Sequence, residues 1–220
     1  MAYPVNTRQT YHHGDLRSAL VTAATHRLET FGIEQLSLRK LAEDLGVSRT
    51  APYHHFKDKN ALLSAVAASG FAQWKQSAQH IFENTADSAA LRLRAFIHAY
   101  IRYAAAHPQL YDLMFGRTLW QHNEADQGLK DIAYPTFQYQ VEMTRYWQQH
   151  GLLPAHPEAL RLAQVTWGTL HGIARLVIDG VYANSSHIED MCDTAADLFM
   201  QLPSAPRTES HTETGHNPAK

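Results

Sequence analysis

The amino-acid sequence predicts an all-α protein, and three observations lead to that class. Along most of the 220 residues, apolar side chains recur at intervals of three and four, which is the period of an amphipathic helix. No run of alternating β-branched residues lies between turn signals, so no strand is predicted. Hydrophobic residues form 45% of the chain and charged residues 18%, which supports a sizeable core and excludes wholesale disorder.

The predicted helices begin at capping residues and end at helix breakers. Gly32 and Gly46 follow the first two helices, and Ser37 and Ser48 are side chains that cap helix N-termini. Pro135 is expected to kink a long helix, because proline removes one intrahelical hydrogen bond. About nine helices are predicted, at residues 16–31, 37–45, 48–55, from 58 past 74, from 87 or 88 to 106, and at 108–116, 126–150, 157–182 and 187–202, with a loop at 117–125.

Composition excludes several classes of protein. Cys192 is the single cysteine, so neither an intramolecular disulfide framework nor a thiolate metal cluster can form. No stretch reaches the roughly 18 apolar residues that a membrane-spanning helix needs. The first residues carry no apolar segment of the kind found in signal peptides. We therefore expect a cytoplasmic protein with no membrane partner.

Charge is unevenly distributed along the chain. Residues 1–60 contain eight Lys or Arg and six Asp or Glu, a net +2, whereas residues 61–202 contain nine and thirteen, a net −4. The basic excess therefore lies in the N-terminal quarter, and its sign permits an anionic partner there.

The segment SLRKLAEDLGVSRTAPYHHFKDK has the form of a helix-turn-helix. Gly46 can adopt the left-handed conformation that ends the first helix, and Ser48 starts the second. In such a unit the second helix lies in the major groove of DNA. Its hydroxyl, imidazole and cationic side chains suit phosphate oxygens, and Arg49 is suited to guanine edges. A structural corner with a solvated basic face is the alternative interpretation.

Two segments, YHHGDLRSALVTAATHRLETFG and LSLRKLAEDLGVSRTAPYHHFKDKNALL, resemble the TetR family of transcriptional repressors. The resemblance implies phosphate contacts by Tyr53, His55 and Lys59. It implies base contacts by the side chains that face the groove, which are Arg49, Thr50, Ala51 and His54, and contacts to the backbone or groove by Ser37 and Arg39. Pro52 departs from the pattern, because many members carry Leu there.

The C-terminal part resembles a subgroup of the same family through H-P-x-L-Y-x-L-M-F-G at 107–116 and W-G-T-L-H-G at 167–172. The resemblance implies the following domains: a flexible arm at 1–13, a helix-turn-helix domain at 14–60, a helical ligand-sensing and dimerisation domain at 61–202 and a disordered tail at 203–220. A homodimer would read a palindromic operator on double-stranded DNA. Helices 157–182 and 187–202 are the expected interface, with Leu160, Ala163, Ile188, Ala195 and Leu198 interdigitating.

The aromatic residues of the C-terminal part favour a pocket for a small apolar or aromatic molecule. Pro135, Gly168 and Gly172 are expected to leave a void, and the loop at 117–125 an entrance. The expected lining comprises Tyr100, Tyr103, Phe137 and Trp167, with His171 and Arg175 as polar handles. Ordinary core packing explains each of these residues singly.

Signals of catalysis and of metal binding are weak. The sequence has no HExxH motif, no Gly-rich phosphate loop and no G-x-S-x-G elbow. The pairs His12-His13 and His54-His55 point in different directions on a helix and do not chelate. We therefore expect a protein that is not an enzyme and that binds no metal and no cofactor. We predict a repressor that leaves its DNA site when its ligand binds. The alternative is a helical small-molecule carrier or enzyme whose N-terminal corner is only structural.

Overall fold

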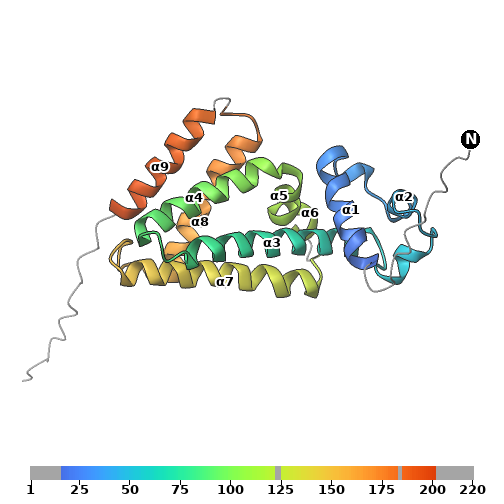
Figure 1. The fold of residues 1–220 in the computed structure, drawn as a ribbon, viewed down its shortest axis with the longest axis horizontal. Helices are drawn as coiled ribbons and strands as arrows, with labels where there is room; N and C mark the ends of the chain where they lie inside the picture. The colour runs from blue at the N-terminus through green and yellow to red at the C-terminus, as the bar shows by residue number, and fades with distance from the viewer. Residues whose placement is uncertain (1–15, 122–124, 183–184, 202–220) are drawn as a thin grey trace, which may run out of the picture.

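A computed structural model describes residues 16–121, 125–182 and 185–201 of the chain, and all regular structure in these ranges is helical (Figure 1). The all-α prediction is therefore confirmed. The predicted arm at 1–13 and tail at 203–220 lie outside the described residues.

The elements follow the predicted order closely. In chain order they are α1 (Leu16–Phe31), the 3₁₀ turn η1 (Ile33–Gln35), α2 (Leu38–Asp44), the 3₁₀ turn η2 (Ala51–His54), α3 (Lys59–Glu83), α4 (Ala89–Ala106), α5 (Pro108–Phe115), α6 (Arg117–Trp120), α7 (Gln127–Gln149), α8 (Ala159–Ile178) and α9 (Ser185–Gln201). The capping residues act as such: Ser37, Asp58 and Ser88 accept hydrogen bonds from the third residue beyond each of them.

The segment expected as a third α-helix, 48–55, is instead a 3₁₀ turn. The Ser48 Oγ accepts from the Ala51 N–H at 3.2 Å, but the residue directly before the turn is Thr50, whose side chain makes no capping bond. The α-helical bond to Ser48 would have to come from the nitrogen of Pro52, which carries no hydrogen. The chain uses i to i+3 bonds instead, such as Tyr53 N–H to the Thr50 carbonyl at 3.1 Å.

One other expectation needs correction. Residues 117–120 form the helical turn α6 rather than a loop, because the Trp120 indole N–H donates to the Met114 carbonyl at 2.6 Å and holds the turn against α5. Pro135 lies inside α7, which continues to Gln149 as the predicted long helix does, and the kink at Pro135 stays a prediction. The helix lies along α3, and this packing supports it where the proline bond is missing (Figure 1).

One continuous apolar core joins the N-terminal and C-terminal parts. The start of α3 packs against α1, and its remainder runs between α4, α5 and α7 in the bundle (Figure 1). Leu20 and Leu28 of α1 belong to the same cluster as Trp74 and Tyr100 of the bundle. α5 also packs against α1. A change in the bundle can therefore reach the helix-turn-helix through packed side chains.

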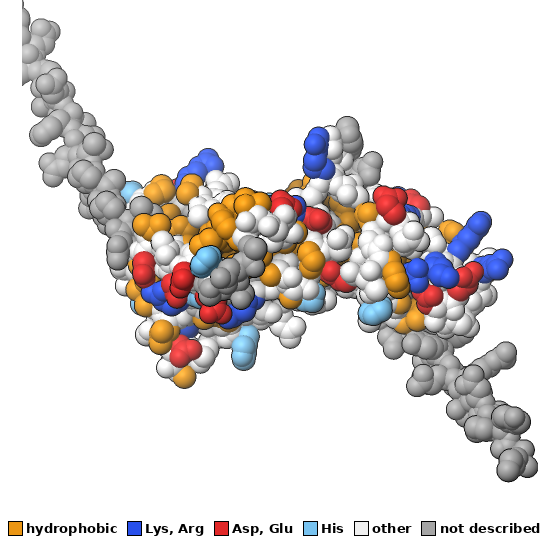
Figure 2. Space-filling view, turned by 90° about the horizontal axis from the view of Figure 1, so that it is seen from above, with side chains coloured by type: hydrophobic (Ala, Val, Ile, Leu, Met, Phe, Trp, Pro, Cys, Tyr) orange, Lys and Arg blue, Asp and Glu red, His pale blue; other side chains and the backbone are white. Residues whose placement is uncertain are grey.

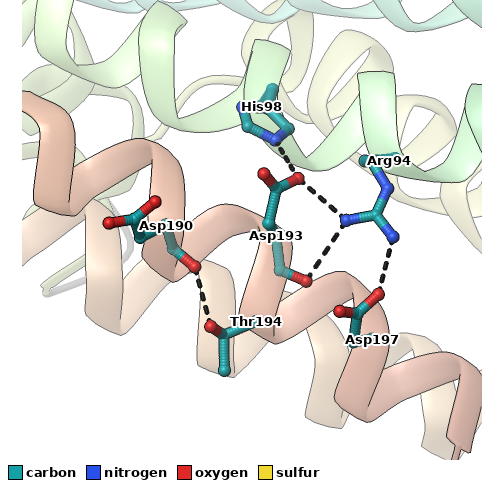
Figure 3. A network of polar contacts seen from close by, with 6 residues as sticks. All are labelled: Arg94, His98, Asp190, Asp193, Thr194 and Asp197. Carbon is teal, nitrogen blue, oxygen red and sulfur yellow. Dashed lines mark hydrogen bonds and ion pairs between the residues drawn. The ribbon is translucent and has the colours of Figure 1, made fainter.

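A network of charged side chains fastens α9 to α4 (Figure 3). Asp193 accepts from Arg94 and from His98, each at 2.8 Å, and Arg94 also donates to Asp197 at 2.6 Å. The bond from His98, followed by that from Arg94, lowers the pKa of Asp193 below its ordinary value. The carboxylate form is therefore favoured in the folded protein.

This lowered pKa sets the pH dependence of the α4–α9 contact. The stabilisation is present above the unfolded pKa of about 3.8 and is lost as the pH falls through the lower folded value. Replacing Asp193 by Asn should lower the thermal midpoint by about 1–4 °C at neutral pH, because exposed ion pairs contribute little. The gap to the unmodified chain should close toward pH 3, as measured by circular dichroism. Asp190→Asn on the same helix is the control, and a gap that stays constant with pH would contradict the assignment.

Candidate DNA-binding surface and ligand cavity

The helix-turn-helix has the predicted turn between its two helical segments, and we call α2, this turn and η2 together the corner. Gly46 follows α2 with a φ of 66°, in the left-handed region that favours glycine, and the Val47 N–H returns to the Ala42 carbonyl at 3.0 Å. Leu41 of α2 and Phe56 after η2 are buried and hold the two segments together. The corner therefore fixes η2 relative to α2.

Most of the predicted DNA-contacting side chains are exposed on this corner. Arg49 has 80% of its side chain accessible and only a 4.0 Å approach to Glu43. Tyr53, Thr50, His54 and the Arg39 of α2 are also exposed, whereas Ala51 and His55 are half-buried. Ser37 is exposed and caps α2, its Oγ accepting from the Lys40 N–H at 3.2 Å. Lys and Arg side chains project at the end of the molecule formed by these segments (Figure 2).

Lys59 differs from the other predicted contacts. Its ammonium group donates to the Ile33 carbonyl at 2.8 Å and is partly buried, so it ties the start of α3 to η1. A phosphate contact by Lys59 would require this bond to be shared or broken. Lys57, two residues earlier, is exposed. The phosphate roles of Tyr53, His55 and Lys59 stay predictions.

A cavity of about 450 Å³ lies between α3, α4, α5, α6, α7 and α8. This volume is within the range of ligand pockets in proteins. Three of the residues predicted to line it do so, namely Tyr100, Phe137 and Trp167. Aromatic side chains that the sequence analysis did not assign to the pocket complete the walls, including Phe71, Trp74, Phe115, Trp120 and Tyr134.

Tyr103, His171 and Arg175 are not among the residues that line the cavity. The Tyr103 hydroxyl donates to the Gly70 carbonyl at 3.0 Å. Arg175 pairs with Asp112 and Asp179, so its charge is satisfied outside the cavity. The prediction of Tyr103 as a lining residue, and of His171 and Arg175 as polar handles of the pocket, is therefore corrected, because polar partners hold these side chains outside the cavity.

His171 is connected to the cavity indirectly through a chain of hydrogen bonds. The Trp167 indole N–H donates to the Tyr100 hydroxyl at 2.9 Å. Tyr100 bonds to the Tyr111 hydroxyl at 2.8 Å, and Tyr111 to His171 Nδ1 at 2.7 Å. Burial, followed by the charge of Arg175, lowers the pKa of His171. Burial raises the pKa values of both tyrosines, so all three groups are neutral near pH 7.

Of the two glycines of α8, Gly168 borders the cavity as expected, whereas Gly172 is not among the residues that line it. Gly172 is exposed, and a Cβ atom added at either glycine would meet nothing within 4 Å. No described residue of the same chain therefore uses the space that they leave. The stripe that they form continues through Val165, which is 64% exposed, and Leu176.

The expected interface residues divide into two groups. Leu160 and Leu198 are exposed and available to a second chain. Ala163 and Ala195 are buried in the protomer's own core, because they lie on the inward faces of α8 and α9, and Ile188 is half-buried against that core. The prediction that Ala163 and Ala195 contact a second chain is therefore corrected, because both are buried within one protomer.

Functional residues that sequence reasoning missed include Gln140 and Glu29. Gln140 lies on the buried face of α7 and lines the cavity. Glu29 of α1 accepts from the Leu110 N–H in the first turn of α5 at 3.0 Å. The helical period alone places Gln140 on the inward face, whereas nothing in the spacing signals the contact of Glu29 with a segment 81 residues away.

In the part of the chain that the structure describes, no three His, Cys, Asp or Glu side chains gather in a way that could hold a metal ion. Cys192 is buried, and this burial, with the charge of Asp193, raises the pKa of its thiol to about 11. The thiol is therefore protonated and unreactive near neutral pH. Among the described helices, none is long and apolar enough to cross a membrane.

Comparisons with known proteins agree with this architecture. Residues 20–66 match the family described as bacterial regulatory proteins, tetR family, and residues 93–199 match the tetracyclin repressor-like C-terminal domain. A solved structure of a protein with unknown function from Rhodococcus sp. RHA1 is 33% identical, with a TM-score of 0.78, over 90% of this chain and all of that one. A TetR family transcription regulator from Marinobacter aquaeolei VT8 shares the fold at 22% identity, with a TM-score of 0.59, over 84% and 95% of the two chains.

Curated relatives match over a shorter stretch. The tetracycline repressor protein class C of Escherichia coli is 49% identical over 51 residues, and that of class A from transposon 1721 is 43% identical over 56 residues. The chain spans about a quarter of the length of these relatives, 23% and 26% respectively. These matches therefore support the assignment of one domain and not of the whole protein.

A helix-turn-helix that shares its core with a helical bundle defines a class, the helical regulators of bacterial transcription. The chain belongs to the TetR family of that class, since its two parts match the family's N-terminal and C-terminal domains in the expected order. The subgroup suggested by W-G-x-x-H-G stays a prediction.

Proposed function

We propose that the protein is a transcriptional repressor that binds a palindromic operator as a homodimer and is released when a small, largely aromatic molecule fills the cavity. The observation that carries this function is the exposed set of Arg49, Thr50, Tyr53 and His54 on a fixed corner. Side chains of these types form hydrogen bonds to bases and phosphates, and their exposure shows that they do not pack in the core of the described residues.

The dimer is supported by the outward face of α8. Val165 and Leu176 are exposed there, and Gly168 and Gly172 leave the helix backbone open beside them. A second copy related by a two-fold axis would cover this face and bring Leu198 of α9 into the same seam. Hydrophobic side chains gather over the C-terminal bundle in Figure 2 as well. Two copies would place two corners on successive half-sites of the operator.

The release mechanism is supported by α5, which touches both the cavity and α1. Met114 and Phe115 of α5 line the cavity, and the start of the same helix is bound by Glu29. A ligand that displaces the C-terminal end of α5 would therefore move α1 and change the separation of the two corners. Such coupling between sites is typically about 1–3 kcal/mol, or 5–150-fold in affinity.

The experiment that tests the function is retardation of DNA from upstream of the protein's own gene, titrated with salt. A repressor should bind tightly and lose affinity steeply as counterions compete with its phosphate contacts. A helical carrier or enzyme with a merely structural corner would show neither sequence preference nor a steep salt slope, and that result would reject the proposal.

Arg49 is expected to determine sequence preference. Replacing Arg49 by Ala should weaken operator binding by about 1–3 kcal/mol and relax specificity at one position of each half-site, because a bidentate contact to guanine is lost. Binding to random DNA should change little. The measurement is competition of operator variants in a fluorescence-anisotropy assay.

Lys57→Ala is the matched control for Arg49→Ala, since Lys57 is an exposed cation on the same corner. It should weaken binding to all sequences alike and reduce the salt slope by about one phosphate contact. If both variants lowered the affinities for operator and for random DNA by the same factor, the assignment of Arg49 as a base-contacting residue would be wrong.

A further inference from the structure

Gln140 is a largely buried residue whose side-chain amide has no hydrogen-bond partner among the described residues. The residue is 8% exposed and lines the cavity, yet no described residue makes a hydrogen bond to its side-chain amide. Its backbone carbonyl is used, since it accepts from the Thr144 hydroxyl at 2.9 Å. The side chain faces the cavity, so its amide is available for hydrogen bonds with a molecule that occupies the cavity.

A second unpartnered group lies on the same face of α7. The indole Nε1–H of Trp147 is buried and has no acceptor among the described residues. Trp147 and Gln140 lie seven residues apart and border a small void of about 10 Å³, which Thr144 and Thr166 also line. The Gln140 amide carries both an NH₂ donor and an oxygen acceptor, and a carboxamide is complementary to both.

Tyr100 is a further polar group of the cavity. Its hydroxyl oxygen accepts from the Trp167 indole N–H and is hydrogen-bonded to the Tyr111 hydroxyl, which in turn bonds to His171 Nδ1. Whichever way the bond between the two tyrosines runs, one hydrogen-bonding position of the Tyr100 hydroxyl is left for a ligand. No charged side chain lines the cavity, whose walls are otherwise aromatic, aliphatic or uncharged polar.

We propose that the cavity recognises an uncharged aromatic molecule with a carbonyl acceptor, of the aryl carboxamide class, which accepts a hydrogen bond from the Gln140 amide. Aromatic rings stack against the walls, and the N–H of the carboxamide is available to Tyr100. This inference rests on the proposed function, because it identifies the ligand of the same regulator. An anionic or cationic molecule of the same shape would lose its hydration and find no counter-charge.

Equilibrium dialysis of the full chain against three probes on one bicyclic frame tests the proposal. The probes are 2-naphthamide, the anion 2-naphthoate and the hydrocarbon 2-ethylnaphthalene. We expect 2-naphthamide to bind about tenfold more tightly than 2-ethylnaphthalene, the usual value of one hydrogen bond. We expect 2-naphthoate to bind on the order of 100-fold more weakly than 2-naphthamide.

The variant Gln140→Leu should abolish the preference for 2-naphthamide over 2-ethylnaphthalene. Gln140→Met, which keeps the length of the side chain, should do the same and guards against a folding defect in the leucine variant. Gln164→Leu is the matched control, because Gln164 also lines the cavity but is exposed and accepts from Arg161 at 2.8 Å. It should leave the preference unchanged.

Three results would overturn the proposal: no binding of 2-naphthamide, equal binding of 2-naphthamide and 2-naphthoate, or an unchanged preference in both Gln140 variants. Dialysis contains no DNA, so its outcome is independent of the operator experiment. A protein that selects 2-naphthamide through Gln140 but binds no DNA would refute the proposed function alone. Operator binding without carboxamide selectivity would refute only the ligand class.

Discussion

Replacing Val165 by Asp is expected to convert the proposed homodimer into a monomer and to weaken operator binding by about 100-fold or more. Val165 is 64% exposed in the middle of α8, next to the open backbone of Gly168. Across a two-fold axis the same surface meets itself, so each introduced carboxylate would be desolvated close to its own copy. A monomer contacts one half-site and loses the base contacts of the other, each mismatched pair being worth about 1–3 kcal/mol.

Sedimentation velocity and operator retardation measure the two effects of Val165→Asp separately. Gln138→Asp adds the same charge to an exposed position on α7, away from the α8 stripe, and should leave both unchanged. A Val165→Asp protein that still sediments as a dimer would place the interface elsewhere. A monomer with undiminished operator affinity would contradict the requirement for two corners.

Local signals explain why most of the fold could be predicted from the sequence. Ser37 caps its helix as predicted, Asp58 and Ser88 cap helices that were expected to begin at 58 and at 87 or 88, and Gly46 has the left-handed φ that a helix end requires. These features depend on neighbours within one turn, which the sequence displays directly. The 3₁₀ form of η2 was harder to predict, because the sequence shows that Pro52 lacks a donor but not which alternative bonds replace the missing one.

The candidate site was less predictable, because its residues depend on contacts between distant segments. Periodicity placed Ala163 and Ala195 on apolar faces but did not show that their own protomer covers them. Arg175 could be assigned to a pocket because Asp112, which pairs with it, lies 63 residues away. The free cation expected of Lys59 is bound by a carbonyl for the same reason.

The aromatic cavity shows where composition does carry information. An excess of amphipathic aromatic residues predicted a pocket, and Tyr100, Phe137 and Trp167 do line one. Its polar character was assigned to the wrong side chains, because His171 contacts it only through Tyr111 and Tyr100. Gln140 reaches the cavity itself, and only the structure shows that its amide has no other partner.

Replacing Glu29 by Ala is expected to uncouple ligand binding from DNA release. The Glu29 carboxylate accepts from the Leu110 N–H at 3.0 Å and lies 3.9 Å from His107 Nδ1, at the N-terminus of α5 where unpaired N–H groups favour an anion. Without this bond, a shift of α5 caused by a filled cavity would no longer pull α1. In the unmodified protein we expect the ligand to lower operator affinity by about 5–150-fold. In the Glu29→Ala variant the ratio of operator affinities without and with ligand should approach one.

Two binding measurements distinguish uncoupling by Glu29→Ala from simple damage. The affinity for 2-naphthamide in dialysis and the affinity for operator without ligand should each stay within about twofold, because Glu29 touches neither site and only the coupling free energy is removed. Glu29→Gln keeps an acceptor oxygen and should retain most of the response. Glu34→Ala removes an exposed carboxylate from nearby η1 and should retain all of it. Full release of operator by 2-naphthamide in Glu29→Ala would show that the signal reaches the corner through the α1–α3 packing instead, since that is the other route by which the shared core joins the two parts.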